Sequence, residues 1–264
     1  MTTPETRQGS ATEPSPVGRF GRLKRDVGQL VLIIGLILVS RTVGAEPFYV
    51  PSGSMEPTLQ IGDELLASKF PYGYSVYSLP LDLDLPSDGR VLGHLPRRGD
   101  VVVFRLPRDP SEVYVKRVIG LPGDRIQMRD GRLWINGTLV PLEPDGTAEM
   151  ELSDGRRVAV PRFIESLPNG RNHPILKLGW SGPLNDTQVY HVPPGHLFMM
   201  GDNRDNSLDS RVAAAAGGVG YVPLANLIGR ADLILGSWDF PAARQSITSW
   251  LSGLRLDRFF SRVG

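Results

Sequence analysis

The segment Val113-Tyr-Val-Lys-Arg-Val-Ile119 indicates the fold, because its side chains alternate between two faces and most of them are β-branched or aromatic. Similar short runs, separated by turn-forming residues, occur at 100–105, 125–128, 133–136, 190–192, 197–200 and 227–235. The dipeptide Asn136-Gly137 is a strong signal for a tight hairpin turn. Glycine (30 residues) and proline (23 residues) are plentiful, and long helical periodicity is scarce. We therefore predict a mainly β protein.

The composition limits the classes of protein to which this chain can belong. Its 264 residues, of which 41% are hydrophobic, suffice for one elaborated domain or a domain with a large insertion. The formal net charge is only +1, so we expect no nucleic-acid partner. Cysteine is absent, which excludes thiol nucleophiles, cysteine-based zinc sites and disulfides.

The N-terminal region has the pattern of a membrane-targeting segment. Residues 1–26 begin with a Thr-, Pro-, Glu- and Ser-rich stretch that we expect to be disordered, and end with the basic residues Arg19, Arg22, Lys24 and Arg25. The apolar run Leu30–Val39 follows and is short for a bilayer span, so a cleaved signal is one interpretation. Residues 27–45 give about 28 Å at roughly 1.5 Å per residue, which favours a transmembrane anchor. Either interpretation predicts an extracytoplasmic remainder, because the basic residues precede the run.

Several common catalytic and metal-binding patterns are absent. Ser54 lies in no G-x-S-x-G or S-x-x-K motif, and the chain has no P-loop or H-E-x-x-H sequence. The stretch Gly201–Asp209 resembles a calcium loop only superficially, since no starting position supplies the required ligands. His191 and His196 fit no zinc spacing. We therefore expect neither a metal nor a cofactor.

Two serines, Ser52 and Ser54, lie in the bent segment Pro51-Ser-Gly-Ser-Met-Glu-Pro-Thr-Leu59. A serine hydroxyl is a weak nucleophile until a base removes its proton. Proline, glycine and serine also form turns that carry no chemistry. The residues alone therefore leave both a plain turn and an exposed nucleophile open.

The four lysines of the chain are the remaining candidates for such a base. Lys24 precedes the apolar run and would face the cytoplasm, which leaves Lys69, Lys116 and Lys177. Alternation places Lys116 on one strand face with Tyr114, where loss of water would lower the pKa of its amine. A drop of about two units raises the neutral fraction near pH 7.4 from about one in a thousand to about one in ten. An exposed lysine at a sheet edge fits the same spacing equally well.

Four segments, in order along the chain, resemble the conserved boxes of bacterial type I signal peptidases. They are Pro51–Leu59 with Ile61-Gly-Asp63, Arg98–Phe104, Tyr114–Asp124 and Gly201–Arg211. The basic N-terminus followed by an apolar run is also similar to the plan of that family. The resemblance implies a membrane-anchored serine protease that removes signal peptides from exported preproteins after a small residue.

The resemblance also implies roles for individual residues. Ser54 matches the family nucleophile, and Lys116 matches its general base. Ser52 matches the residue whose hydroxyl forms the oxyanion hole together with the backbone N–H of Ser54. Supporting positions are matched by Ser207, which in the family bonds the lysine amine, and by the ion pair of Asp209 with Arg211.

The family plan implies a signal peptidase-like β-sheet catalytic core, an inserted second β domain and one N-terminal transmembrane helix. On this plan residues 1–26 are cytoplasmic, 27–45 form the anchor, 46–125 and 196–264 form the core, and 126–195 form the insertion. We expect a monomer in the bacterial inner membrane, with its catalytic domain on the periplasmic side. Its partners would be exported preproteins and the lipid bilayer.

Two departures from the family pattern stand beside the resemblance. After Arg211 the chain has the Ala- and Gly-rich stretch 212–220 where many relatives have an aromatic-glycine pair, and it has one apolar segment where some relatives have two. Two alternative functions remain. One is a relative with another task, such as a self-cleaving repressor or a pilin or conjugation-factor peptidase. The other is a non-catalytic, membrane-tethered β domain that binds exported chains.

Overall fold

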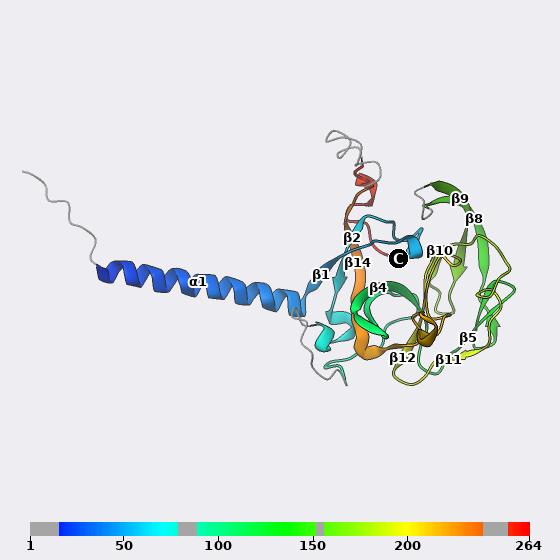
Figure 1. Ribbon diagram of the computed structural model, residues 1–264, viewed down its shortest axis with the longest axis horizontal. Coiled ribbons are helices and arrows are strands. Elements are labelled where there is room, and N and C mark those ends of the chain that lie inside the picture. Colours follow the sequence, from blue (N-terminus) through cyan, green and yellow to red (C-terminus); the bar gives the residue numbers. More distant parts are fainter. Residues whose placement is uncertain (1–15, 79–88, 152–155, 240–252) are drawn as a thin grey trace, which may run out of the picture. The chain divides into compact units, whose positions relative to one another are not determined.

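The computed structural model describes residues 16–78, 89–151, 156–239 and 253–264 of the protein (Figure 1). The chain divides into two compact units, residues 1–40 and 41–264. The first is helical where it is described, and the second is built from strands.

Helix α1 (Pro16–Val43) provides the described part of the first unit. It begins at a proline, whose fixed φ suits the first turn of a helix. The apolar side chains from Leu30 to Ile34 are exposed. In the part of the chain that the structure describes, no helix combines the length and apolar character needed to cross a membrane. The transmembrane anchor at 27–45 therefore stays a prediction, and residues 1–15, expected to be disordered, lie outside the described part.

The second unit is built around a seven-stranded sheet in which each neighbouring pair is antiparallel. The order across the sheet is β1 (Ala45–Tyr49), β2 (Asp63–Ser68), β14 (Leu227–Ser237), β3 (Val101–Leu106), β4 (Asp109–Gly120), β12 (His196–Met200) and β13 (Val222–Pro223). Strands that are far apart in the sequence, such as β2 and β14, therefore lie side by side (Figure 1).

Alternation along β3 buries both faces of this sheet. Val101 and Val103 join one apolar cluster with Met55, while Val102 and Phe104 join a second cluster. Fully burying a side chain of this size contributes roughly 1.5–3 kcal/mol. The loop that carries Met55 is thus fastened to the sheet by its own apolar residue.

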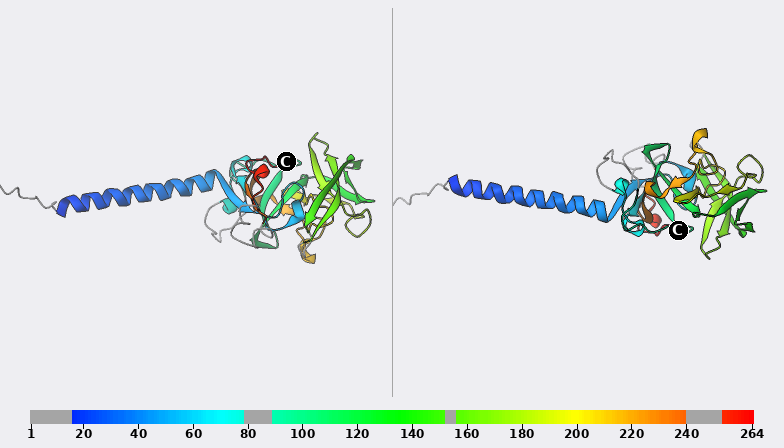
Figure 2. Two further views of the ribbon diagram at one scale, coloured as in Figure 1. Left: turned by 90° about the horizontal axis from the view of Figure 1, so that it is seen from above. Right: turned by 90° about the horizontal axis from the view of Figure 1, so that it is seen from below.

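Two smaller antiparallel sheets are formed by the strands between β4 and β12. One has the order β11 (Tyr190–His191), β5 (Arg125–Arg129), β6 (Arg132–Ile135) and β7 (Thr138–Leu139). The other has the order β10 (Asn172–Leu176), β9 (Arg157–Ser166) and β8 (Leu142–Glu151). Figure 2 shows the green strands of these sheets grouped together.

The hairpin predicted at Asn136-Gly137 is confirmed. Both residues have positive φ angles, 53° and 83°, as a tight turn of this kind requires. Ile135 pairs with Thr138 across the turn, and the Asn136 side chain accepts the Arg125 N–H at 2.8 Å.

Short 3₁₀ helices connect the strands. They are η1 (Gly53–Met55), η2 (Phe70–Tyr72), η3 (Val76–Ser78), η4 (Ala214–Ala216), η5 (Leu224–Asn226) and η6 (Leu256–Arg258). Helix η4 lies in the Ala- and Gly-rich stretch that departs from the family pattern.

The mainly β class is confirmed, and each strand predicted from the sequence is present with small differences at its ends. Strands β1, β2, β7, β8, β9, β10 and β13 are additional. The region 126–195 forms its own sheets, but residues 41–264 make one compact unit. An independent inserted domain is therefore not confirmed and stays a prediction.

Candidate active site

The turn between β1 and β2 presents Ser54 on the short helix η1. The Val50 N–H donates to the Asp63 carbonyl at 2.9 Å, and the Gly62 N–H donates to the Val50 carbonyl at 3.0 Å. These bonds close the turn at its base, and the fully buried Met55 holds it against the sheet. Ser54 itself is only half-buried, so its hydroxyl can meet a substrate.

The amine of Lys116 lies against that hydroxyl. Its Nζ donates to the Ser54 Oγ at 2.7 Å and to the Val115 carbonyl at 3.0 Å. The same Nζ lies 5.3 Å from the ring centroid of Tyr114, the neighbour that strand alternation predicts. Lys116 is 3% exposed, so the interpretation as a solvated edge lysine is wrong.

Burial lowers the pKa of the Lys116 amine to about 8, from an ordinary value of 10.5. The loss of water is the main cause, and the negative charges of Asp209 and Asp202 act against it. With a pKa near 8, about a fifth of the amine is neutral at pH 7.4, compared with about a thousandth for a free lysine. The group can therefore accept a proton near neutral pH.

A cavity of about 460 Å³ opens beside these two groups. Its walls are mostly apolar, and its lining includes Phe48, Tyr49, Ser52, Ser54, Leu65, Val103, Val113, Val115, Lys116 and Leu208. The volume lies within the range of small-ligand sites in proteins. Small apolar groups could be accommodated there beside the Ser54 hydroxyl.

The structure brings Ser52 close to Ser54 but leaves the Ser207 hydroxyl without a hydrogen bond to the described residues. The hydroxyl oxygens of Ser52 and Ser54 are 3.5 Å apart. Ser207 is buried, and among the described residues its hydroxyl finds no hydrogen-bond partner. The contact of Ser207 with the lysine, implied by the family resemblance, thus stays a prediction.

Asp209 and Arg211 form a fully buried ion pair with two hydrogen bonds, at 2.8 and 2.9 Å. The same carboxylate accepts the Gly201 N–H at 3.1 Å, and the guanidinium donates to the Arg204 carbonyl at 2.6 Å. Arg211 is the chief charge that lowers the pKa of the Asp209 carboxyl, against the opposing effect of burial. The pair ties the two ends of the loop 201–211 together.

Gly201 and Asn203 contact the serine turn, and sequence reasoning missed both. A Cβ atom on Gly201 would lie 2.4 Å from the Ser54 carbonyl oxygen and 2.2 Å from the Ser207 Oγ. Asn203 donates its backbone N–H to the Ser54 carbonyl at 3.1 Å and its side-chain amide to the Gly53 carbonyl at 3.0 Å. The loop therefore lies in direct contact with the backbone that carries the hydroxyl.

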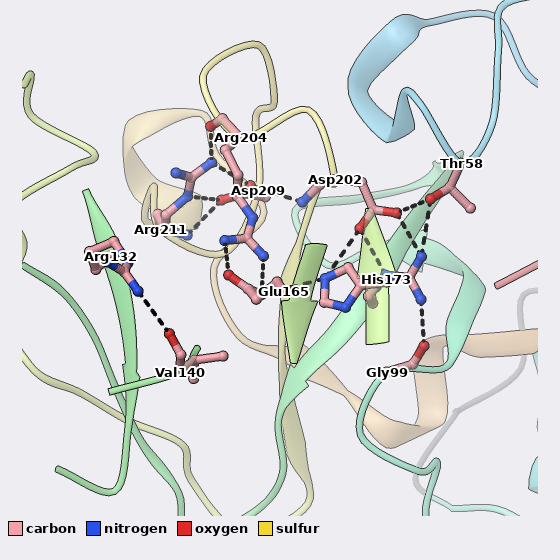
Figure 3. A network of polar contacts seen from close by, with 12 residues as sticks. Thr58, Gly99, Arg132, Val140, Glu165, His173, Asp202, Arg204, Asp209 and Arg211 are labelled. Atoms are coloured by element: carbon pink, nitrogen blue, oxygen red, sulfur yellow. Dashed lines mark hydrogen bonds and ion pairs between the residues drawn. The ribbon is translucent and has the colours of Figure 1, made fainter. Parts of the chain in front are cut away.

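A buried network, seen in Figure 3, holds this loop to the sheet. Arg117 donates two hydrogen bonds to the Asp202 carboxylate, at 2.8 and 2.7 Å, and a third to the Gly99 carbonyl at 2.7 Å. Thr58 donates to the same carboxylate at 2.5 Å. Arg117 follows Lys116 directly, so one strand contributes both the amine and the cation that fastens the loop.

A second buried ion pair, Arg204 with Glu165, lies near the pair of Arg117 with Asp202. Arg204 makes a bidentate contact with Glu165, one bond of which measures 2.6 Å. His173 lies between the two carboxylates, with its Nε2 at 3.4 Å from Glu165 and 3.9 Å from Asp202. Burial is the main reason that the pKa of His173 falls to about 4, so the imidazole is neutral near pH 7. In the sequence, the only signal for these ion pairs is the mixture of acidic and basic residues in Gly201–Arg211.

The acidic residues of the loop are used in ion pairs. Asp202 meets Arg117, Asp209 meets Arg211, and Asp205 lies 3.4 Å from the Lys177 amine. Among the described residues, no cluster of three or more His, Asp or Glu side chains could hold a metal ion. The stretch that resembles a calcium loop has no free set of carboxylates in the structure.

A serine hydroxyl in contact with a buried amine, at the wall of a largely apolar cavity, has the geometry of a serine hydrolase. The profile of the family described as signal peptidase, peptidase S26, matches residues 23–238. The chain belongs to this family, whose members are serine proteases.

Curated relatives agree with this assignment. The signal peptidase I of Rickettsia prowazekii is 38% identical over 257 residues, covering 91% of this chain and 94% of the relative. The signal peptidase I of Rickettsia typhi gives the same identity and coverage. A crystal structure of a signal peptidase I from Enterococcus faecalis is 28% identical, and the match covers 52% of this chain and 97% of that chain with a TM-score of 0.30.

Proposed function

We propose that the protein is a membrane-anchored serine endopeptidase that cleaves N-terminal signal peptides from exported preproteins after a small residue. Ser54 is the nucleophile and Lys116 is the general base. The observation that carries this assignment is the 2.7 Å contact between the Ser54 Oγ and the buried amine of Lys116. Membership of the signal peptidase family supports the substrate class.

The reaction follows from the two groups. The neutral Lys116 amine accepts the Ser54 proton while the Oγ attacks the carbonyl carbon of the scissile bond. The ammonium then protonates the leaving amine, the C–N bond breaks, and the acyl group remains on Ser54. Lys116 next takes a proton from water, whose hydroxide attacks the acyl carbon. The bond between this carbon and the Ser54 Oγ breaks, and the released carboxylic acid loses its proton to solvent. The ammonium finally returns a proton to the Ser54 oxygen.

The negative charge on the carbonyl oxygen needs donors in the transition state. The Ser54 N–H and the Ser52 hydroxyl are proposed for this role, since Gly53, Ser52 and Ser54 all line the cavity. One well-placed donor of this kind contributes roughly 3 kcal/mol to the stability of the transition state. Ser207, Asp209 and Arg211 are proposed to support the lysine through the loop 201–211.

Anchoring at the membrane completes the proposal. The basic residues before the apolar run orient residues 27–45 with the N-terminus in the cytoplasm. The catalytic unit then lies on the periplasmic side of a bacterial inner membrane, where preproteins emerge. A monomer suffices, because the described residues of one chain supply both reacting groups.

The test is the incubation of detergent-solubilised protein with a preprotein, followed by sequencing of the new N-terminus. The expected result is a single cut after a small residue, which is abolished in Ser54→Ala and in Lys116→Ala. Circular dichroism checks that both variants fold. Full cleavage by either variant would refute the assignment, and binding of the preprotein without cleavage by the wild type would favour a non-catalytic binding domain.

A further inference from the structure

Asn203 contacts the serine turn on both sides of the Ser54 Cα atom. It is fully buried. Its backbone N–H donates to the Ser54 carbonyl at 3.1 Å, and its Nδ2 donates to the Gly53 carbonyl at 3.0 Å. One residue thus fixes the peptide unit before Ser54 and the peptide unit after it.

The bond to the Gly53 carbonyl has a consequence for the Ser54 N–H, because both belong to one peptide unit. A trans peptide is planar, and its C=O and N–H point in opposite directions. The Gly53 carbonyl accepts the Asn203 amide and also the Glu56 N–H at 3.1 Å. With the carbonyl held on that side, the Ser54 N–H must point away from Asn203.

We propose that Asn203 is a positioning residue that aims the Ser54 N–H at the oxyanion of the tetrahedral intermediate. This inference rests on the proposed peptidase function. Gly53 and Ser54 both line the cavity in which the scissile carbonyl would bind. An oxyanion donor contributes only when it is already directed to the place where charge develops. Rotation of this peptide unit would misdirect the donor while Ser54 and Lys116 keep their contact.

The surroundings of Asn203 are rigid enough for this role. Its neighbours Asp202 and Arg204 are each held by the buried ion pairs of Figure 3. The Leu176 N–H donates to the Asp202 carbonyl at 2.9 Å, and the Arg204 N–H donates to the Leu176 carbonyl at 3.0 Å. Asn203 is therefore bonded to the framework on both sides and reaches the serine turn from a fixed position.

Two substitutions separate the amide donor from the rest of the residue. Asn203→Asp keeps the shape of the side chain but removes the donor and brings a carboxylate close to Glu56, whose Oε2 lies 3.5 Å from the present amide. Asn203→Ala removes the donor without adding charge. Both variants keep the backbone bond to Ser54, and either one alone suffices if the other does not fold.

The expected result is a kcat about 100-fold lower in both variants, with KM changed less than about threefold. In Asn203→Ala, which adds no charge, the pH midpoint of kcat/KM stays at its wild-type value, because the surroundings of the Lys116 amine keep their charges. Asn226→Asp is the matched control. The Asn226 Nδ2 is also largely buried and donates to the Arg105 carbonyl at 2.9 Å, but it lies outside the cavity lining. This control is expected to retain wild-type kcat.

A second readout distinguishes oxyanion positioning from a structural role. A peptide aldehyde adds to a serine hydroxyl and places an oxyanion in the hole, whereas an uncleavable peptide of the same sequence does not. The Asn203 variants should lose affinity for the aldehyde in parallel with kcat and keep their affinity for the uncleavable peptide. Unchanged kcat in the variants, or equal loss of affinity for both peptides, overturns the proposal. Lack of cleavage by the wild type overturns the proposed function instead.

Discussion

Lys116 and Lys69 are both buried lysines, yet their amines have opposite surroundings. The side chain of Lys69 is fully enclosed, and its amine lies 2.8 Å from the Glu46 carboxylate and 2.7 Å from the Ser78 carbonyl. The amine of Lys116 contacts the Ser54 hydroxyl and a backbone carbonyl. Within the described residues no carboxylate pairs directly with it. One amine has a compensating charge, and the other does not.

The difference teaches what converts a buried lysine into a base. Desolvation disfavours the ammonium, and a carboxylate in contact restores much of the lost stabilisation. Lys177 is an intermediate case, because burial lowers its pKa while Asp205, at 3.4 Å, acts against the shift. Its amine is engaged by the Asn185 side chain at 2.5 Å. The Lys116 amine, by contrast, is buried, contacts the Ser54 hydroxyl and pairs directly with no carboxylate of the described residues.

Replacing Lys116 with arginine is the most severe test of this comparison. A guanidinium remains charged at any accessible pH and cannot take the Ser54 proton. We expect kcat/KM for preprotein cleavage to fall at least about 1,000-fold, within the range for loss of a general base. The matched control is Lys69→Arg, which keeps a cation beside Glu46 and should stay within about threefold of the wild type. Similar losses in both variants would contradict a special role for Lys116.

A substitution at Gly201, which contacts the backbone of Ser54, tests whether the Lys116 amine needs a correctly placed Ser54 hydroxyl. In Gly201→Ala the new Cβ would lie 2.4 Å from the Ser54 carbonyl oxygen, which is too close for any unshifted structure. We expect Ser54 to move away from Lys116 and kcat to fall about 100-fold, since small misplacements of reacting groups cost this much. A Cβ on Gly179 meets no atom within 4 Å, so Gly179→Ala is the control. Equal kcat in both variants would argue against a tight fit at Gly201.

The pH dependence of cleavage measures the pKa of the Lys116 amine, which has no carboxylate in direct contact among the described residues. Because the pKa of Lys116 is lowered to about 8, the neutral fraction rises about tenfold between pH 7 and pH 9. We expect kcat/KM to rise by about the same factor over this range and then to level off. A rise that continues to about pH 10.5, the ordinary value, would mean that the amine is hydrated in solution.

The same shift predicts how stability changes with pH. The folded state releases the Lys116 proton near pH 8, whereas the unfolded state keeps it until about pH 10.5. Between these values the unfolded state binds more protons, so the free energy of unfolding rises with pH. The contribution amounts to about 3 kcal/mol at full extent. It is measured as the difference between wild type and Lys116→Met in urea unfolding at pH 7.5 and pH 10.

The sequence alone led to the two central groups but not to their surroundings. Few lysines were available, and strand alternation placed Lys116 beside Tyr114, as the structure has it. Because neighbouring residues of a strand point to opposite faces, alternation places Arg117 on the face opposite Lys116. Its partner Asp202 lies 85 positions further along, and no local spacing encodes a contact formed by the packing of separate strands.

Two of the strands that sequence reasoning missed, β1 and β10, carry residues that break the usual pattern. β1 and β10 contain Pro47 and Pro174, which normally argue against a strand. Both are edge strands of their sheets, where a missing N–H leaves no ladder bond unmade. The position of a strand within a sheet is a tertiary property, so the local sequence could not reveal that these prolines are tolerated.

Removing the amine of Lys69 should have the smallest effect on catalysis of these changes. Its effect on stability should be opposite to that of removing the amine of Lys116. Lys69→Met leaves the partly exposed Glu46 carboxylate and the Ser78 carbonyl without their cation, and we expect about 2 kcal/mol of lost stability. Activity per folded molecule should stay within about twofold. Lys116→Met removes a poorly compensated charge and should keep or raise stability at pH 7.5 while cleavage is lost. Urea unfolding of both variants checks the signs. If both lost stability equally, an acidic partner would not be what separates the two lysines.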